Sequence, residues 1–277
     1  MAEGRYRDTR YLKFLRNFKG KFCFVIDSLD FFQRWFFQKL SSRKKIEADN
    51  NKYLHILCIK RDDYVIPTLN CVNSFWQFHP EFKVKIWCDA LRKELLWKNL
   101  KKFHRSDRIE FQIINPKRNW QEDKLHIICN ELLPQHIFSD ADIFWNGRIT
   151  ISNTPLFFLR EYDFDEVSTT KRLKKLLKLD ASKTWFMLNV SVVNLGLLSN
   201  NRNLFSRARQ LLEFILEIED DKSLGSREII QLHRTCEQLA ISIAIQEMGD
   251  FECIKYSDYL LDGGIIESFY LGATKGF

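Results

Sequence analysis

Glycine and proline are scarce in this sequence of 277 residues, with 10 and 5 occurrences respectively. This scarcity excludes collagen-like repeats and argues against long low-complexity segments. The sequence also lacks a long uninterrupted apolar run, since the most apolar stretch near residue 22 contains Asp27, Asp30 and Arg34. We therefore expect no membrane-spanning helix there. We also expect no signal peptide, because the first residues are polar and basic.

No CxxC motif and no paired Cys/His spacing is present, so the sequence does not predict a zinc site or a disulfide framework. Most cysteines lie in apolar stretches, which favours reduced thiols packed in the core and a reducing compartment such as the cytoplasm. His55, His126 and His136 also have apolar neighbours, which favours packing over catalysis. The seven cysteines are Cys23, Cys58, Cys71, Cys88, Cys129, Cys236 and Cys253.

Apolar residues make up 45% of the chain, with 24 phenylalanines and 7 tryptophans, and this is enough for a sizeable core. The formal net charge is +7. Such a balance favours polyanionic partners, namely nucleic acid, anionic lipid or a nucleotide diphosphate. Solvated basic surfaces are the simpler alternative for each single cluster of basic residues.

Residues 1–50 differ from the rest and are predicted to form a basic, aromatic helical extension. Leu29, Phe32, Phe36 and Leu40 fall on one face of a helix. Such a helix can make peripheral contact with the inner face of a membrane, or it can dock on the domain that follows. Residues 51–277 are predicted to form that second domain.

From residue 53 onward, strand-like and helix-like patterns alternate. Strands are predicted at 53–60, 82–89, 108–115 and 136–145, and helices at 66–79, 90–104 and 122–134. Later segments predict a strand at 185–198 and helices at 203–219 and 237–249. This order predicts an α/β fold with an open sheet flanked by helices. In such sheets, ligands bind at the carboxyl ends of the strands.

Two aspartates, Asp140 and Asp142, interrupt the apolar segment 136–145. Alternation along a strand places such a pair on one face, and two carboxylates at a strand end suit Mg²⁺ or Mn²⁺. Two solvated acids at a strand-to-loop junction remain the alternative. Asp62 and Asp63 follow the first predicted strand and Asp89 ends the second, so these acids are expected to converge on one edge of the sheet.

Several short motifs occur in a fixed order around this acid pair. Lys124-Leu125 opens a predicted helix, Leu132-Leu133-Pro134 ends it, and Asp140-Ala141-Asp142 follows, with Gly147 after it. Together with Asp62-Asp63-Tyr64, this order resembles a GT-A glycosyltransferase. It is most similar to the family 8 group that includes glycogenin and bacterial lipopolysaccharide galactosyl- and glucosyltransferases.

The resemblance covers residues 53–277 and implies roles for individual side chains within that range. Two positions depart from the family pattern: Phe269 stands where a metal-binding histidine is expected, and Leu239 stands where an aspartate is expected. The implied assignments are Asp140 and Asp142 for the metal ion, Asp62, Asp63, Tyr64, Lys124, Gly272 and Lys275 for the nucleotide-sugar donor, Asn189 for the acceptor, and Glu237 and Gln238 for catalysis.

The implied function is hexosyl transfer from a nucleotide-diphosphate sugar to a hydroxyl of a glycan or lipid-linked acceptor. The resemblance also implies Mn²⁺ or Mg²⁺ as cofactor and retention of the anomeric configuration. A non-catalytic GT-A-like domain that binds nucleotide-sugar or a partner is the alternative. No recognised nucleic-acid motif is present, so no nucleic-acid partner is expected. For Glu237, residue patterns alone leave open a solvated carboxylate on a helix surface.

Overall fold

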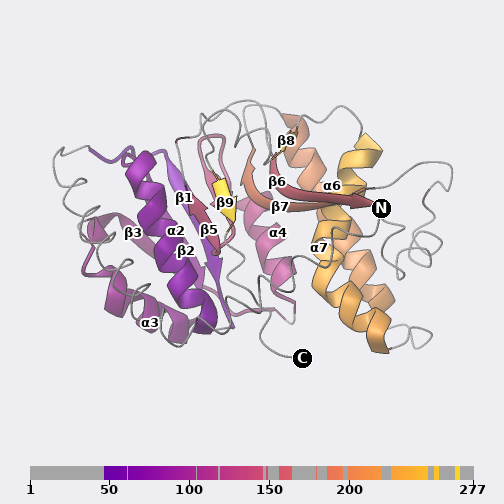
Figure 1. The fold of residues 1–277 in the computed structure, drawn as a ribbon, viewed down its shortest axis with the longest axis horizontal. Helices are drawn as coiled ribbons and strands as arrows, with labels where there is room; N and C mark the ends of the chain where they lie inside the picture. Colours follow the sequence, from indigo (N-terminus) through magenta and orange to yellow (C-terminus); the bar gives the residue numbers. More distant parts are fainter. Residues whose placement is uncertain are drawn as a thin grey trace, which may run out of the picture. The chain divides into compact units, whose positions relative to one another are not determined.

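The strands and helices of the computed structural model follow the alternating order that the sequence predicts (Figure 1). Residues 1–46 lie outside the described part of the chain, so the predicted extension and its boundary at residue 50 stay predictions. The described residues all belong to one unit, Glu47–Phe277, and are 47–60, 62–103, 105–117, 119–145, 148, 156–163, 179, 186–195, 199–219, 226–248, 253–255 and 266–268.

The first half of this unit contains the predicted run of alternating elements. The predicted strand 136–145 is wrong in one respect, because the acid pair divides it into β4 and β5 (Ile143–Trp145). Two short 3₁₀ turns, Asp62–Tyr64 and Ser106–Arg108, precede α2 and β3. The regular elements are β1 (Tyr53–Cys58), α2 (Val65–Phe78), β2 (Lys83–Cys88), α3 (Ala90–Leu100), β3 (Ile109–Ile113), α4 (Trp120–Asn130) and β4 (Ile137–Ser139).

The second half contains one predicted strand, two predicted helices and three strands that the sequence did not predict. The unpredicted strands are β6 (Leu156–Asp163), β8 (Cys253–Lys255) and β9 (Ile266–Ser268). Strands of three residues are too short for a recognisable alternation. The confirmed elements are β7 (Phe186–Asn194), α6 (Ser199–Glu219) and the second half of α7 (Ser226–Met248), which begins eleven residues before the predicted start.

Seven strands form one mixed sheet in the order β3-β2-β1-β4-β7-β6-β8. The first four are parallel to one another, β7 is antiparallel to both β4 and β6, and β8 is parallel to β6. The predicted α/β class with an open mixed sheet is therefore confirmed. Because β3, β2, β1 and β4 are parallel, their carboxyl ends lie along one edge of the sheet, which we call the carboxyl edge.

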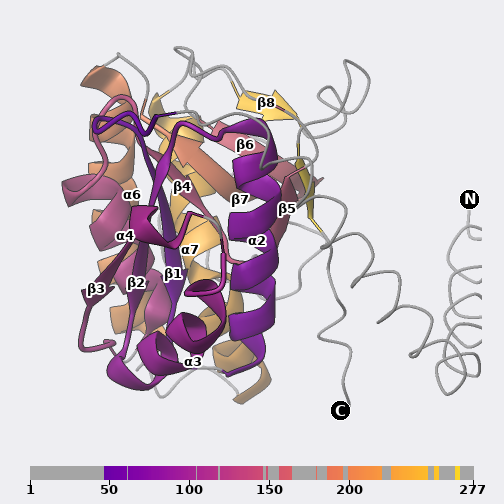
Figure 2. The same cartoon turned by 90° about the vertical axis from the view of Figure 1, so that its left-hand side faces the viewer.

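Helices cover both faces of the sheet (Figure 2). Alternate residues of β1 point to opposite faces, so Leu54 and Ile56 pack with α2 and α3. On the other face, Trp87 and Phe138 pack with α4, α6 and α7. Two buried apolar clusters result, one on each side of the sheet. In the described ranges, no helix is long and apolar enough to cross a membrane.

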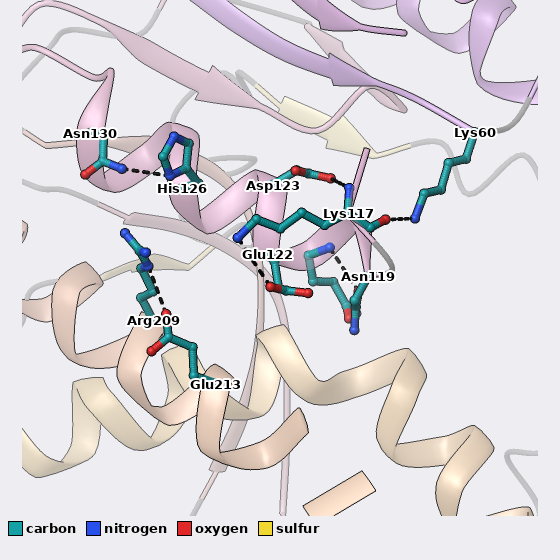
Figure 3. Close-up of polar contacts among 10 residues, drawn as sticks. Lys60, Lys117, Asn119, Glu122, Asp123, His126, Asn130, Arg209 and Glu213 are labelled. Carbon is teal, nitrogen blue, oxygen red and sulfur yellow. Dashed lines mark hydrogen bonds and ion pairs between the residues drawn. The ribbon is translucent and has the colours of Figure 1, made fainter. Parts of the chain in front are cut away.

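Buried histidines confirm one part of the sequence prediction and correct another. His55 Nε2 lies 3.0 Å from His136 Nδ1, and the indole N–H of Trp87 donates to His55 Nδ1 at 3.1 Å. Burial, followed by repulsion from His136, lowers the pKa of His55 to about 3. His126, by contrast, is exposed on α4, where it contacts Asn130 (Figure 3). The prediction that His126 is packed is wrong.

Phe75 of α2 anchors the core beneath the acid pair, because its ring lies 4.9 Å from that of Trp145 and 5.2 Å from that of Phe82. Phe75→Ala is expected to lower the free energy of unfolding by about 3–5 kcal/mol, measured by chemical denaturation, because it leaves a cavity. Phe214→Ala is the control, since Phe214 is 44% exposed, and should cost at most about 0.5 kcal/mol. Equal costs would contradict this packing.

Candidate active site

The acid pair lies in the turn between β4 and β5, at the carboxyl edge of the sheet. Side chains of helix α2 contact the backbone at both ends of this turn. The Cys71 thiol lies 3.8 Å from the carbonyl oxygen of Asp140, and Ser74 Oγ accepts the backbone N–H of Trp145 at 3.0 Å. The turn is therefore held by buried side chains, which restricts where Asp140 and Asp142 can lie.

A buried lysine binds the first aspartate of the pair. Lys124 is 2% exposed, and its ammonium lies 2.7 Å from Asp140 Oδ1 and 2.7 Å from Glu237 Oε1. It also donates to the backbone carbonyl of Val190 at 3.1 Å. Helices α4 and α7, strand β7 and the turn after β4 thus meet at one ammonium. We call Asp140, Lys124 and Glu237 the buried triad.

The sheet itself supplies the third acceptor of Lys124. Strand β4 pairs with β7 only as far as Ser139 opposite Val192. Beyond this point β4 ends, so a side chain from α4 can reach the β7 backbone at Val190. The early end of β4 thus makes room for the buried triad beside the acid pair.

Charge pairing keeps Lys124 ionised in spite of its burial. Burial opposes the charge, but the attraction of Asp140 and then of Glu237 outweighs it, so the pKa of Lys124 lies above its ordinary value. Glu237 is 3% exposed. Burial raises the pKa of Glu237 and Lys124 opposes that rise. The structure therefore excludes the alternative of a solvated Glu237, and this carboxyl is a partner of Lys124.

Asp142 lies in a different electrostatic setting from Asp140. Burial, followed by repulsion from Asp140, raises the pKa of Asp142 to about 6. No basic side chain of the described residues forms an ion pair with Asp142. One carboxylate of the pair is thus neutralised by Lys124, while the other carries a charge that its surroundings disfavour. A cation beside Asp142 would relieve this cost.

This donor set fits a magnesium-type ion, which binds through one or two carboxylates plus waters and phosphate oxygens. Within the described residues, no three His, Cys, Asp or Glu side chains are grouped so that they could hold a metal ion alone. The C-terminal segment comes close to the pair, because Ser268 of β9 lies opposite Ile143, directly after Asp142. Phe269, where the resemblance expects histidine, lies outside the described residues.

The predicted nucleotide residues lie in the loop between β1 and α2. Asp62 and Asp63 are exposed and Tyr64 is half-buried. Asp62 Oδ1 lies 2.9 Å from Arg92 Nη2, and Thr68 of α2 donates to the Tyr64 carbonyl at 2.7 Å. This loop sits at the carboxyl end of β1, as predicted.

The loop between β3 and α4 is tied to the same edge (Figure 3). Asp123 accepts the backbone N–H of Lys117 at 3.0 Å, and the ammonium of Lys60 donates to the carbonyl of Lys117. Burial raises the pKa of Asp123. Asn119 caps α4 by accepting the N–H of Gln121 at 3.0 Å. Helix α4 therefore connects this loop to Lys124.

The remaining predicted residues are placed only in part. Asn189 lies in β7, where two residues of β6 face one of β7 between the pairs Phe158–Val190 and Glu161–Leu188. Gln238 follows Glu237 on α7 and is half-buried. The predicted donor residues Gly272 and Lys275 lie outside the described residues, as does Gly147.

Sequence reasoning did not single out Arg92 or Asp123, and it placed Asp89 at the edge of the sheet without a partner. A capping signal was present for Asp89 and Asn119, because each precedes a helix at a position that favours Asp or Asn. Their long-range partners have no sequence signal, since Arg92 and Asp62 are thirty residues apart. Only the parallel order of the strands brings these side chains together.

No protein-family model matches this chain, and no curated protein sequence matches it. Among solved structures, it is similar to the mannosyltransferase Ktr4p from S. cerevisiae, with 10% identity, a TM-score of 0.43, and coverage of 81% of this chain and 78% of that chain. Mouse xyloside xylosyltransferase 1 has 10% identity, a TM-score of 0.42, and coverage of 76% and 85%. The galactosyltransferase LgtC has 13% identity, a TM-score of 0.40, and coverage of 65% and 69%.

Removing the ammonium of the buried triad should be costly, because it leaves buried carboxylates without a cation. Lys124→Met is expected to lower the free energy of unfolding by about 3–5 kcal/mol in chemical denaturation. In the double variant Lys124→Met/Glu237→Gln, the cost should fall below the sum of the single costs by about 1–3 kcal/mol. Lys98→Met, at an exposed position of α3, is the control. Additive costs would contradict direct pairing.

The two aspartates should respond oppositely to the same substitution in metal-free buffer. The pKa of Asp142 is raised from 3.8 to about 6, so its contribution to stability is full below pH 3.8 and lost as pH rises through about 6. At pH 7, Asp142→Asn should raise the free energy of unfolding by about 1–3 kcal/mol. This gain should vanish near pH 4.

Asp140→Asn is the matched control for this experiment, because it removes a partner of buried Lys124. It should lower the free energy of unfolding at pH 7 by about 1–3 kcal/mol. The same sign for both variants in denaturation curves would contradict the different roles of the two carboxylates.

Proposed function

We propose that this chain is a metal-dependent glycosyltransferase of GT-A architecture that uses a nucleotide-diphosphate sugar. The observation that carries the proposal is the unequal acid pair at the carboxyl edge of the sheet. Asp140 is bound to Lys124 at 2.7 Å, whereas Asp142 has a pKa raised to about 6. Strongly shifted pKa values cluster at functional sites, where burial and neighbouring charges are arranged to produce them.

Asp140 and Asp142 are proposed to hold Mn²⁺ or Mg²⁺. When bound, such an ion acts as a Lewis acid that stabilises the negative charge developing on a diphosphate leaving group. Lys124 contributes by fixing Asp140 and by lowering the net negative charge of the acid pair. Glu237 holds Lys124 from the other side, so we assign it to positioning and not to direct contact with the sugar.

The donor nucleotide is proposed to lie across the β1–α2 loop. A carboxylate such as Asp62 or Asp63 accepts hydrogen bonds from ribose hydroxyls or a base N–H, and Tyr64 offers a ring for stacking. Gly272 and Lys275 are proposed, on the resemblance, to approach the diphosphate. The lysine would add positive charge there.

On the acceptor side, Asn189 is the proposed contact, and Gln238, which the resemblance assigns to catalysis, is proposed to contact the acceptor as well, because amide groups donate to and accept from sugar hydroxyls. The β-bulge on β6 opposite Asn189 supports this role, since bulges often lie next to active sites. Gln238 is the neighbour of Glu237 in sequence and is half-buried on α7. Hexosyl transfer with retention, the glycan or lipid-linked acceptor, and a cytoplasmic location with peripheral membrane contact through residues 1–50 belong to the same proposal.

A non-catalytic GT-A-like domain is the second candidate, and one residue favours it. Leu239 stands where the resemblance expects an aspartate, and its side chain is 0% exposed in the core. A buried leucine can neither bind a cation nor accept a hydrogen bond. Such a domain would still bind nucleotide-sugar, so turnover separates the two candidates.

The test combines ligand binding with donor turnover. UDP-glucose, UDP-galactose and GDP-mannose are each added to the full chain with and without Mn²⁺, and the melting temperature and nucleotide release are measured. One donor should raise the melting temperature in the presence of Mn²⁺, because a ligand of the native state stabilises it. Asp142→Asn should abolish this shift and reduce turnover at least about 100-fold.

Glu122→Gln is the matched control, since Glu122 pairs with Lys117 on the surface and should leave turnover unchanged. Manganese-dependent binding without turnover would favour the non-catalytic domain. If no donor shifts the melting temperature, or if Asp142→Asn turns over donor as the unmodified chain does, the proposed function is wrong.

A further inference from the structure

Lys60, at the end of β1, has an unusual backbone conformation. Its φ is 63°, and it is the non-glycine residue with positive φ within the described ranges. The left-handed region is unfavourable for a lysine, because Cβ approaches the backbone. Such conformations persist where the surrounding structure holds them in place, and they cluster at functional sites.

Two side chains at the start of α3 hold this backbone. The carboxylate of Asp89 accepts the N–H of Lys60 at 3.0 Å, and Arg92 Nη2 donates to the Lys60 carbonyl at 2.8 Å. Both backbone polar groups of Lys60 are therefore bound by α3 and the residue before it. We call Asp89 and Arg92 the clamp.

The clamp is itself assembled within the first turn of α3. Asp89 uses its other oxygen, Oδ1, to cap the helix through the N–H of Arg92 at 3.0 Å. The same oxygen lies 3.4 Å from Arg92 Nη1. Burial opposes the charge of Asp89, but the N–H groups of Lys60 and Arg92 outweigh it, so its pKa lies below its ordinary value. One carboxylate thus starts α3 and anchors the end of β1.

Arg92 extends the clamp to the predicted nucleotide loop. Its Nη2, which binds the Lys60 carbonyl, also lies 2.9 Å from Asp62 Oδ1. The Arg92 side chain is 15% exposed, and its Nε is buried with no hydrogen-bond partner in the described part of the chain. Burying Nε without a hydrogen-bond partner costs free energy. Stability alone therefore does not explain the buried Arg92, whereas a positioning role does.

We propose that Asp89 and Arg92 are positioning residues for nucleotide binding, which they serve by holding Lys60 in its left-handed conformation and so presenting the 62–64 loop. This inference rests on the proposed function, because it assigns the loop to the nucleotide. Neither side chain needs to touch the ligand. A preformed loop binds more tightly because its ordering cost is met during folding.

The first test measures hydrogen exchange of residues 59–64 in the full chain without ligand. Asp89→Ser retains a hydroxyl that can cap α3 but lacks the second oxygen for Lys60. Exchange in 59–64 is expected to rise at least about tenfold, while exchange in α3 stays unchanged. Asp107→Ser, at an exposed position, is the control. Unchanged exchange in 59–64 would overturn the inference.

A second substitution separates the conformational role from any other. Asparagine adopts the left-handed region more readily than lysine. Lys60→Asn should therefore restore slow exchange in 59–64 in the Asp89→Ser background. On its own it removes the ammonium contact with the Lys117 carbonyl, but it should change exchange in 59–64 little, because the clamp already populates the left-handed conformation. Lys60→Val should accelerate exchange in both backgrounds. If Lys60→Asn fails to restore protection, holding the left-handed backbone is not the function of the clamp.

The final test measures the dissociation constants of UDP and GDP with Mn²⁺. For the nucleotide that binds, Asp89→Ser should weaken binding about five- to tenfold, and Lys60→Asn should recover it. Unchanged affinity in Asp89→Ser would overturn the inference alone and leave the proposed function intact. If neither nucleotide binds the unmodified chain, the proposed function fails, and the role of the clamp in nucleotide binding fails with it.

Discussion

The buried ammonium of Lys124 is the interaction on which the rest of the site depends. It joins α4, the end of β4, the backbone of β7 and helix α7 at a single point, through Asp140, Val190 and Glu237. The contact between Lys124 and Glu237 links segments that are more than a hundred residues apart in sequence. A buried cation tolerates few arrangements of its partners, because each lost contact leaves a charge uncompensated. The buried triad therefore fixes how α4 and α7 pack against the turn between β4 and β5, which we call the acid turn.

The carboxyl edge consists of two linked parts. One is the acid turn with the buried triad, and the other is the β1–α2 loop with its clamp. Helix α4 connects them, because Asp123 binds the β3–α4 loop and the adjacent Lys124 binds the acid turn. The ammonium of Lys60 donates to the carbonyl of Lys117 and so links the β1–α2 loop to the β3–α4 loop (Figure 3). A ligand that spans both parts would meet groups whose relative positions are set by the sheet and one helix.

Sequence patterns predicted the regular part of this fold and the place of the acid pair. Strands such as Tyr53–Cys58 and helices such as α4 have clear periodicity, so their order was readable. The division of 136–145 at Asp140 was not, because a turn of three residues resembles a strand end. Sequence could nominate Lys124 and Glu237, but their burial and pairing depend on how α7 packs against α4. Arg92 had no signal at all, since its long-range partners Lys60 and Asp62 lie in the β1–α2 loop.

Cys71 gives the acid turn a chemical property of its own. Its thiol is 0% exposed, contacts the carbonyl of Asp140, and has a pKa that burial raises to about 12. Only the thiolate reacts appreciably with alkylating agents, so this cysteine is inert while α2 stays against the turn. Cys71 can therefore be alkylated only when α2 separates from the turn, so its rate of alkylation measures how often that separation occurs. The chain thus contains a native reporter of how often its acid turn opens.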